Sequence, residues 1–308
     1  MKYLFFKDAN HFTKLFMLVF FAFTCVVIMS VISVLLSAFI FDIDISNVNS
    51  YLKTENPENI PFIKFFQSFY SIGMFLIPAF LFAFLFSVKP LSYLNADKKI
   101  SGGEIILVLL IIVLALPGIN YAGMINSKID MPDFLSGMDK DLEKSVIALL
   151  KADSITGLII NIFVIAFLPA VGEEFLFRGV IQKIFISWTK NIHIGIIVTA
   201  VIFSAFHFQF SGFIPRFLLG VLFGYMLVWT GKIILTILAH FINNAVAVVF
   251  FYLYYGTPRW ESAESIGAKN DDFFIMIISL TFTLSLLFIF RKHYSLQKAE
   301  KNPTLSEE

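Results

Sequence analysis

The chain has 308 residues, of which 58% are hydrophobic and only 15% charged, and its formal net charge is +1 at pH 7. Soluble globular domains carry about 25% charged and about 45–50% apolar residues, so this composition argues against a soluble protein and predicts an integral membrane protein. The near-zero net charge leaves no field that would attract nucleic acid. Because Cys25 is the lone cysteine, the chain can form neither an intrachain disulfide nor a cysteine-based metal site.

Eight apolar stretches are candidates for spanning helices, since a helix needs about 20 apolar residues to cross a bilayer. The first of them has 27 residues without a charge. No small-residue cleavage site follows it, so we expect this stretch to stay in the mature protein rather than to act as a cleaved signal. The predicted spans are residues 15–41, 65–88, 105–125, 155–186, 192–207, 213–230, 233–255 and 273–290.

Residues 132–151 follow a different pattern. Apolar residues recur there at spacings of three and four, and charged residues fill the opposite face. This pattern predicts an amphipathic helix that lies at the membrane interface. Such a helix either packs on the bundle as a surface element or acts as a lid or guide for a substrate, and the sequence leaves both possibilities open.

We expect one integral membrane domain over residues 1–297 and a disordered polar tail over residues 298–308. Eight spans place both termini on one side of the membrane. Lys and Arg are slightly more frequent in the segments on that side than in the opposite loops, to which we assign Arg216. The positive-inside rule therefore favours a plasma (inner) membrane protein with both termini in the cytoplasm.

Ionisable residues interrupt the apolar character between residues 155 and 207. An ionisable group at bilayer depth costs about 2.5–3.5 kcal/mol on insertion scales, so its presence needs compensation or a function. Glu174 and Arg178 stand four residues apart, which predicts an ion pair on one helix face and is a sufficient structural reason for both. Glu173 lies about 100° round the helix from that pair. It is therefore the carboxylate most suited to chemistry.

Three further polar residues lie in later spans, where we expect them to face Glu173. Glu173 precedes Lys190 by 17 residues and His207 follows it by 17. In a hairpin that turns near Lys190, both would lie about 25 Å from the turn, at about 1.5 Å per residue. His240 and Asn244 stand four residues apart and share one helix face. The sequence thus predicts a pocket with one carboxylate, two imidazoles and a carboxamide.

Such a pocket has the groups needed to hydrolyse a peptide bond. Glu173 and His207 would activate water, and His240 and Asn244 would donate hydrogen bonds to the oxyanion. No cofactor is then required. Alternatively, Glu173, His207 and His240 could hold a catalytic zinc ion, although the H-E-x-x-H helix of soluble zinc proteases is missing. A non-enzymatic alternative is an ion or proton relay, or an immunity or scaffold protein with structural buried charges.

At these residues the chain resembles the CPBP family of intramembrane proteases, which includes type II CAAX prenyl endopeptidases and bacteriocin-processing and self-immunity proteins. The family pattern is E-E-x-x-x-R, then F-x-x-x-H, then H-x-x-x-N, on successive helices of an eight-helix bundle. The matching residues, all within 155–247, are Glu173, Glu174, Arg178, Phe203, His207, His240 and Asn244.

The resemblance implies an endopeptidase in which Glu174 and Arg178 support the site and the other polar residues act as described above. It implies a membrane-embedded or lipidated peptide or protein as the substrate, cleaved in CAAX-type C-terminal processing or in bacteriocin-type processing. The motifs do not identify that substrate.

Overall fold

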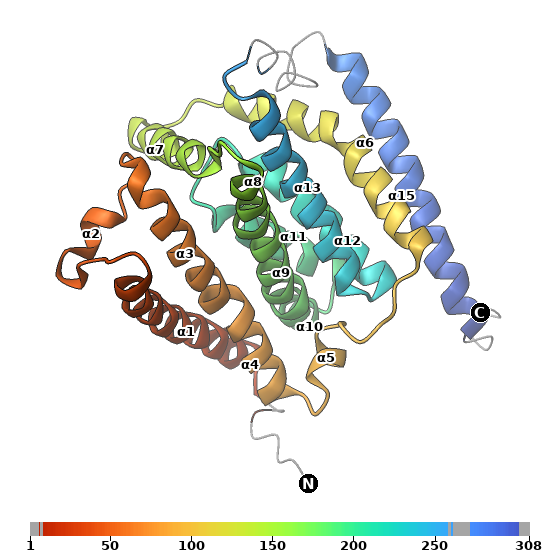
Figure 1. Ribbon diagram of the computed structural model, residues 1–308. Coiled ribbons are helices and arrows are strands. Elements are labelled where there is room, and N and C mark those ends of the chain that lie inside the picture. Colours follow the sequence, from red (N-terminus) through yellow and green to blue (C-terminus); the bar gives the residue numbers. More distant parts are fainter. Residues whose placement is uncertain (1–5, 7–8, 258–259, 261–271, 302–308) are drawn as a thin grey trace.

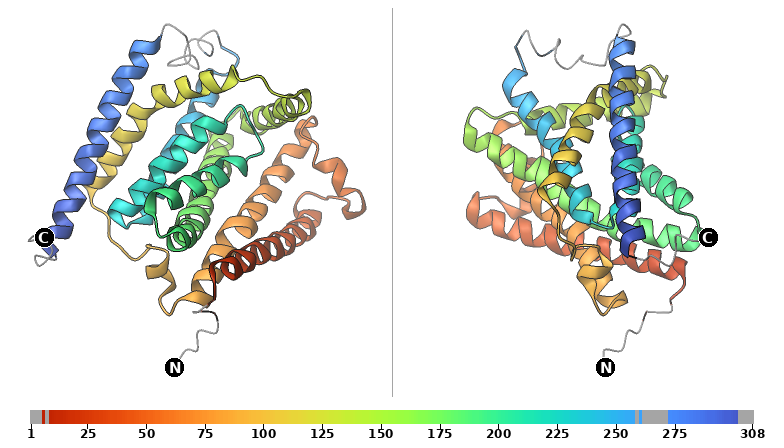
Figure 2. Two further views of the ribbon diagram at one scale, coloured as in Figure 1. Left: turned by 180° about the vertical axis from the view of Figure 1, so that it is seen from behind. Right: turned by 90° about the vertical axis from the view of Figure 1, so that its right-hand side faces the viewer.

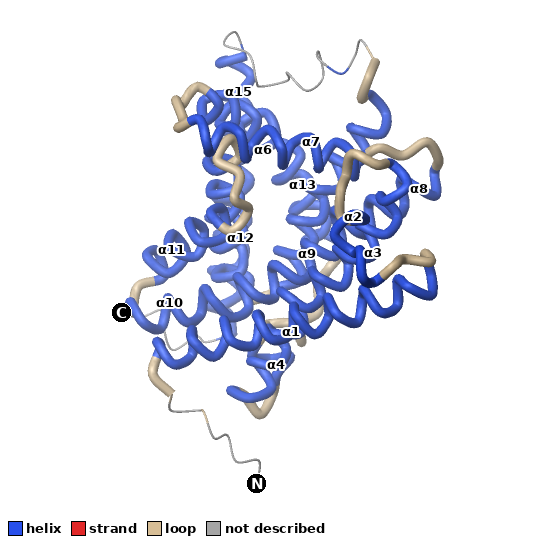
Figure 3. Tube along the Cα trace, turned by 90° about the vertical axis from the view of Figure 1, so that its left-hand side faces the viewer, coloured by secondary structure: helices blue, strands red, loops and turns tan. Residues whose placement is uncertain are grey.

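The computed structural model describes residues 6, 9–257, 260 and 272–301. Throughout this part of the chain all regular structure is helical, which confirms the predicted all-α class (Figure 3). Helices α1 and α15 lie at opposite edges, and the remaining helices fill the space between them (Figures 1 and 2). Helix α15 continues through Lys301, past the expected start of the polar tail, and residues 302–308 lie outside the described residues.

Seven helical stretches in the described part of the chain are long and apolar enough to cross a membrane, which confirms the predicted polytopic bundle. Large side chains point outward from them, as lipid-facing surface requires; Phe39 of α1 is 89% exposed. The seven stretches are α1 (His11–Ile40), Pro57–Phe86, α6 (Gly102–Ser127), Ile155–Thr189, α12 (Phe213–Thr230), α13 (Ile233–Tyr254) and Phe273–Ser295 of α15 (Phe273–Lys301).

Two of these stretches contain π-helical segments, which the sequence did not indicate. The first stretch joins α3 (Ile60–Ser71), η3 (Ile72–Leu76) and α4 (Ile77–Phe86). The second joins α8 (Ile155–Asn161), η4 (Ile162–Phe167), α9 (Leu168–Glu173), η5 (Glu174–Ile181) and α10 (Gln182–Thr189). Here η3, η4 and η5 are the π-helical segments. Such segments are rare in proteins, and those that occur often lie at functional sites.

The predicted span over residues 192–207 is shorter than expected. Helix α11 (Ile192–Ala205) has 14 residues, or about 21 Å at about 1.5 Å per residue, against a hydrocarbon core of about 30 Å. It is followed by residues 206–212, which we call the α11–α12 loop. Because α11 is too short to cross the bilayer, this loop begins at membrane depth, where its backbone N–H groups need partners from the protein.

The turn between α10 and α11 has the position that the sequence predicted. Lys190 adopts a left-handed conformation with φ of 52°, and the Asn191 side chain caps the start of α11. The two helices then pack closely at Gly195, where a Cβ atom would lie 2.4 Å from Cγ1 of Ile186. This antiparallel hairpin brings the segments that carry Glu173 and His207 to comparable depth.

Helix α6 contains Pro117, which removes one backbone donor from the helix interior. Ser279 of α15 compensates nearby: its hydroxyl donates to the carbonyl of Leu114 at 2.6 Å and accepts from the N–H of Gly118 at 3.1 Å. A neighbouring helix thus completes the hydrogen bonding of α6, as the apolar membrane interior requires.

The predicted amphipathic helix is confirmed as α7 (Asp133–Leu150). It packs on α3 and α13 near the start of α8 (Figure 1). One of its charged residues, Asp139, is only 7% exposed, although the periodicity places it on the polar face. Helix α7 is therefore more than a surface element, because a buried carboxylate needs polar partners.

Candidate active site

The structure brings four of the predicted side chains to one cavity of about 420 Å³. Glu173 comes from the end of α9, His207 from the residues that follow α11, and His240 and Asn244 from α13. The shared face expected for His240 and Asn244 is present, since both line the cavity. Apolar side chains of α7, α9, α12 and α13 complete its walls: Val146, Leu150, Pro169, Leu219, Phe223, Ala247 and Val248.

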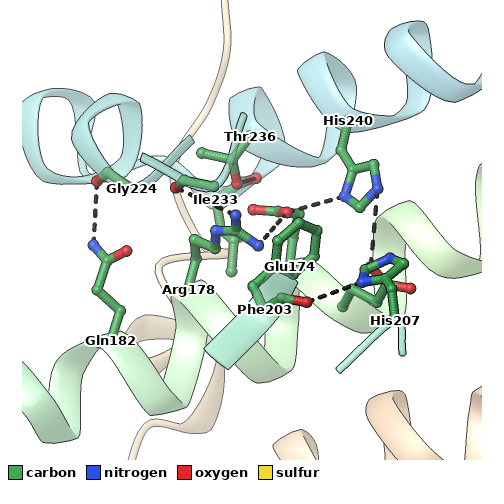
Figure 4. Close-up of polar contacts among 11 residues, drawn as sticks. Glu174, Arg178, Gln182, Phe203, His207, Gly224, Ile233, Thr236 and His240 are labelled. Atoms are coloured by element: carbon green, nitrogen blue, oxygen red, sulfur yellow. Dashed lines mark hydrogen bonds and ion pairs between the residues drawn. The ribbon is translucent and has the colours of Figure 1, made fainter. Parts of the chain in front are cut away.

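The ion pair predicted between Glu174 and Arg178 is present beside this cavity (Figure 4). Nη1 of Arg178 lies 2.9 Å from Oε1 of Glu174, and both side chains are fully buried. Oε1 also accepts a hydrogen bond from Nδ1 of His240 at 3.0 Å. The carboxylate therefore orients both the arginine and the imidazole, and the contact with His240 was not predicted from the sequence.

Glu173 differs from its neighbour in having few polar partners. Its Oε2 atom lies 4.0 Å from Nε2 of His240 and makes no hydrogen bond, although it is buried. A buried carboxylate oxygen without a hydrogen-bond donor is costly and calls for an explanation. Its position in the cavity wall leaves it free to accept a proton from a molecule in the cavity.

The contacts of His207 fix which ring nitrogen carries the proton. Nδ1 lies 2.9 Å from the carbonyl oxygen of Phe203, and a carbonyl can only accept, so Nδ1 is the donor. In the neutral ring Nε2 is then an acceptor. The Phe203 ring also lies under the guanidinium of Arg178, with Cζ 4.4 Å from its centroid. This explains why the second motif pairs a phenylalanine with the histidine.

The amide of Asn244 is oriented by its chain neighbour. Nδ2 of Asn243 donates to Oδ1 of Asn244 at 3.2 Å. This contact occupies the acceptor of Asn244 and leaves its Nδ2 donors for a molecule in the cavity, which both asparagines line.

Sequence reasoning missed Arg216, which we assigned to a loop. The structure places it in the first turn of α12, where it lines the same cavity as Glu173 and His207. It is the only charged residue between His207 and Lys232. A lone charge at the edge of an apolar span is the signal that could have identified it.

Two buried polar side chains from outside the motif region hold the α11–α12 loop. The carboxylate of Asp139 accepts from the backbone N–H of Phe210 at 2.9 Å and of Ser211 at 2.7 Å. Asn126, at the end of α6, donates to the carbonyl of Phe210 at 2.8 Å and accepts from the N–H of Ile214 at 2.7 Å. Helices α6 and α7 thus fix the loop that joins His207 to Arg216.

Asp139 remains charged over the neutral range. Burial raises the pKa of this carboxyl, but the backbone hydrogen bonds from Ser211 and Phe210, with the charge of Arg216, outweigh burial and hold the pKa below its usual range. A carboxylate whose folded pKa is depressed stabilises the fold fully above the unfolded value of about 3.9. Its contribution is lost only as the pH falls through the lower folded value.

We therefore expect Asp139→Asn to lower stability by about 1.5–3 kcal/mol, because the amide cannot accept both charge-assisted hydrogen bonds and turns a donor toward a backbone N–H. The loss should be constant near neutral pH and disappear in acid. Thermal unfolding in detergent over a pH series measures it. Asp141→Asn is the matched control, because Asp141 is exposed on the same helix. Equal midpoints for the two variants at pH 7 would contradict the assignment.

The side chains do not fit the alternative zinc site. A zinc ion needs its nitrogen and oxygen ligands at about 2.0–2.2 Å. Within the described residues, no three His, Cys, Asp or Glu side chains are grouped so that they could hold one metal ion. We therefore derive no catalytic step through a metal.

The fold and the cavity define a class: an integral membrane helix bundle with a Glu/His-lined cavity among its helices. The family model described as type II CAAX prenyl endopeptidase Rce1-like matches residues 155–246. This segment contains all three motifs, and the match confirms, for the part of the chain that it covers, the resemblance that the motifs predict.

The chain is also similar to a curated protein whose name gives no activity. The uncharacterized protein YpbD of Bacillus subtilis (strain 168) is 37% identical over 90 residues, which cover 28% of this chain and 43% of that protein. The chain thus spans less than half the length of this relative. No solved structure matches the chain.

Proposed function

We propose that this protein is an intramembrane endopeptidase that hydrolyses a peptide bond of a membrane-associated or lipidated protein or peptide. The carrying observation is that Glu173, His207, His240 and Asn244, from two helices and the α11–α12 loop, line one cavity. Oε2 of Glu173 and Oε2 of Glu174 both lack a hydrogen-bond partner, but of the two residues Glu173 lines the cavity, which supports its role as the base. The match of the Rce1-like family model to residues 155–246 supports a protease.

Water activation follows from the contacts of Glu173 and His207. A water molecule in the cavity donates one proton toward Glu173 and the other toward Nε2 of His207, the acceptor of the neutral ring. Glu173 takes the first proton as the water oxygen attacks the carbonyl carbon of the scissile bond. A new carbon–oxygen bond forms and the carbonyl electron pair moves onto its oxygen.

The resulting oxyanion is stabilised by hydrogen-bond donors from α13. Asn244 donates from Nδ2, because its Oδ1 already accepts a hydrogen bond from Asn243. For His240 to donate from Nε2, its ring must carry both protons, because Nδ1 donates to Glu174. The positive charges of His240 and Arg178 are then balanced by the two adjacent glutamates. Collapse of the tetrahedral adduct breaks the carbon–nitrogen bond, and Glu173 returns its proton to the leaving amine.

The membrane setting supports a substrate that arrives through or along the bilayer. Short loops connect most of the membrane helices, so little of the protein lies outside the bundle to grip a folded domain. The family description includes prenyl endopeptidases. CAAX-type C-terminal processing and bacteriocin-type processing are the two forms that such a reaction would take.

Cleavage by the purified full chain tests the proposal. The probe is a library of fluorescence-quenched peptides, each prepared with and without an S-farnesyl group and assayed in detergent micelles. We expect cleavage that persists when a chelator is present, because the cavity side chains do not form a zinc site. Cleavage abolished by the chelator and restored by zinc would instead establish a metallopeptidase. No cleavage of any peptide would favour the structural or relay alternative.

For the orientation, we propose a plasma (inner) membrane location with both chain termini in the cytoplasm, supported by the distribution of Lys and Arg among the loops. The turns at Lys190 and Gly231 then face the cytoplasm, and α7 faces the opposite side. Accessibility of single cysteines introduced at the exposed Lys190 and Lys140 to a membrane-impermeant reagent tests this arrangement, with Cys25 replaced by Ala.

A further inference from the structure

Arg216 lines the cavity, and the described residues offer no ion-pair partner for its charge. Nη1 donates to the carbonyl oxygen of Gln209 at 3.1 Å, and Nη2 donates to Oε1 of the same residue. Both acceptors are uncharged. Across the described residues, no carboxylate oxygen lies within 4.0 Å of the Arg216 nitrogens. Arg178, by contrast, has Glu174 at 2.9 Å.

The two carboxylates whose charges act on Arg216 have other tasks. Both oxygens of Asp139 accept backbone N–H groups of the α11–α12 loop. Glu173 lines the same cavity but lies beyond ion-pair distance, and it is the base of the proposed reaction. Glu173 and Arg216 thus both line a cavity of about 420 Å³ without forming an ion pair with each other.

A guanidinium among apolar helices that closes no ion pair is costly, even with the charges of Glu173 and Asp139 nearby, so its retention indicates an anionic partner that is not part of the bundle. Arginine presents five N–H donors and binds carboxylates through two parallel hydrogen bonds. Gln209 occupies two of these donors. The anion that every unmodified peptide carries is its C-terminal carboxylate. We propose that Arg216 binds this carboxylate of the substrate, an inference that rests on the proposed peptidase function.

A second cavity gives the bound end of the peptide a place for its side chain. This cavity has a volume of about 550 Å³ and lies among α6, α12 and α13, and it shares Arg216, Leu219, Asn243 and Ala247 with the first. Its lining is mostly apolar: Val113, Leu116, Ile119, Val246, Phe250 and Trp260 are among its residues. A carboxylate on Arg216 therefore places an apolar C-terminal side chain in this second cavity.

This arrangement also sets the direction of the substrate. The scissile carbonyl lies between Glu173 and His240, and the chain on the leaving-amine side runs to Arg216. The released fragment is then a short C-terminal peptide, and its new N-terminal amine carries the proton from Glu173. An internal segment of a long protein cannot satisfy Arg216 in this way.

A pair of peptides that differ only at the C-terminus tests the proposal. The probe is the best peptide from the cleavage library, prepared as the free acid and as the C-terminal amide. For the wild-type chain we expect kcat/KM to be at least about tenfold higher for the free acid, as one charge-assisted hydrogen bond provides. In Arg216→Gln the kcat/KM of the free acid should fall to that of the amide, so that the preference for the free acid disappears.

Two further variants separate this role from a structural one. Arg291→Gln makes the same charge change on an exposed part of α15 and should leave the preference for the free acid intact. Arg216→Lys should restore part of the preference, because the charge remains. If Arg216→Gln lowers cleavage of the acid and the amide by the same factor, Arg216 only stabilises the α11–α12 loop through Gln209, and the proposal is wrong.

A binding measurement keeps this inference separate from the peptidase reaction. Fluorescence anisotropy with Glu173→Gln protein should show tighter binding of the free acid than of the amide, and Arg216→Gln in that background should abolish the difference, whether or not cleavage occurs. Equal binding of the two peptides to the Glu173→Gln protein would overturn the proposal. The same measurement in lipid vesicles with and without an anionic lipid is a further test. A preference that depends on the anionic lipid rather than on the peptide terminus would also overturn the proposal, since Arg216 would then bind a headgroup phosphate.

Discussion

Glu173→Gln should lower kcat for the reporter peptide by a factor of about 10²–10⁴, the contribution of a positioned general base. The substitution preserves the size of the side chain and removes its ability to take a proton from water. It should not lower the unfolding midpoint, because Oε2 of Glu173 makes no hydrogen bond that the amide would lose. Cleavage followed by mass spectrometry and thermal unfolding, both in detergent, measure the two expectations.

Glu143→Gln is the matched control for this prediction. Glu143 is an exposed glutamate of α7, so the same chemical change there should alter neither kcat nor the midpoint. Wild-type turnover by a folded Glu173→Gln protein would remove Glu173 from the reaction. A loss of turnover together with a lower midpoint, absent from the control, would assign Glu173 a structural role instead.

The bundle could be predicted largely because lipid imposes a simple requirement on length and apolarity. Each long apolar stretch of the sequence corresponds to a helix, and the amphipathic pattern of residues 132–151 corresponds to α7. The exception is α11. Hydropathy continued through Phe206 and predicted a span to residue 207, whereas the helix ends at Ala205. A hydropathy profile does not register that neighbouring side chains can hold a loop at membrane depth.

The candidate site could be predicted where a local spacing determines a contact. The four-residue spacing of Glu174 and Arg178 was sufficient for their ion pair, even within a π-helical segment. The hydrogen bond between Glu174 and His240 joins residues 66 positions apart, and no local periodicity encodes it. It depends on how α13 packs against η4, α9 and η5, which only the folded bundle determines.

Asp139 and Asn126 escaped prediction for a related reason. Both lie outside the motif region, and polar residues on the charged face of an amphipathic helix, as Asp139 is, or at the end of an apolar helix, as Asn126 is, are ordinarily solvated. Here they are buried because the short α11 leaves backbone N–H and C=O groups that need partners. The need arises in one part of the chain and is met from another, so neither segment alone reveals it.

Arg178→Met should lower the free energy of unfolding by about 3–5 kcal/mol, because it leaves the buried charge of Glu174 without its partner. Lys144→Met is the matched control. Lys144 lies 3.3 Å from Asp141, but both side chains are more than three-quarters exposed, so this substitution should cost less than about 1 kcal/mol. Unfolding monitored by circular dichroism, in detergent with increasing denaturant, compares the two variants.

A second substitution, Glu174→Gln in the Arg178→Met protein, separates stability from chemistry. It removes the bare charge and keeps an oxygen that can accept from Nδ1 of His240, so most of the lost stability should return. Cleavage should nevertheless stay at least about tenfold below wild type, because a neutral amide accepts from the imidazole more weakly than the carboxylate does and orients it less firmly. Full activity in the double variant would show that this pair only stabilises the bundle, and that His240 stabilises the oxyanion without help from Glu174.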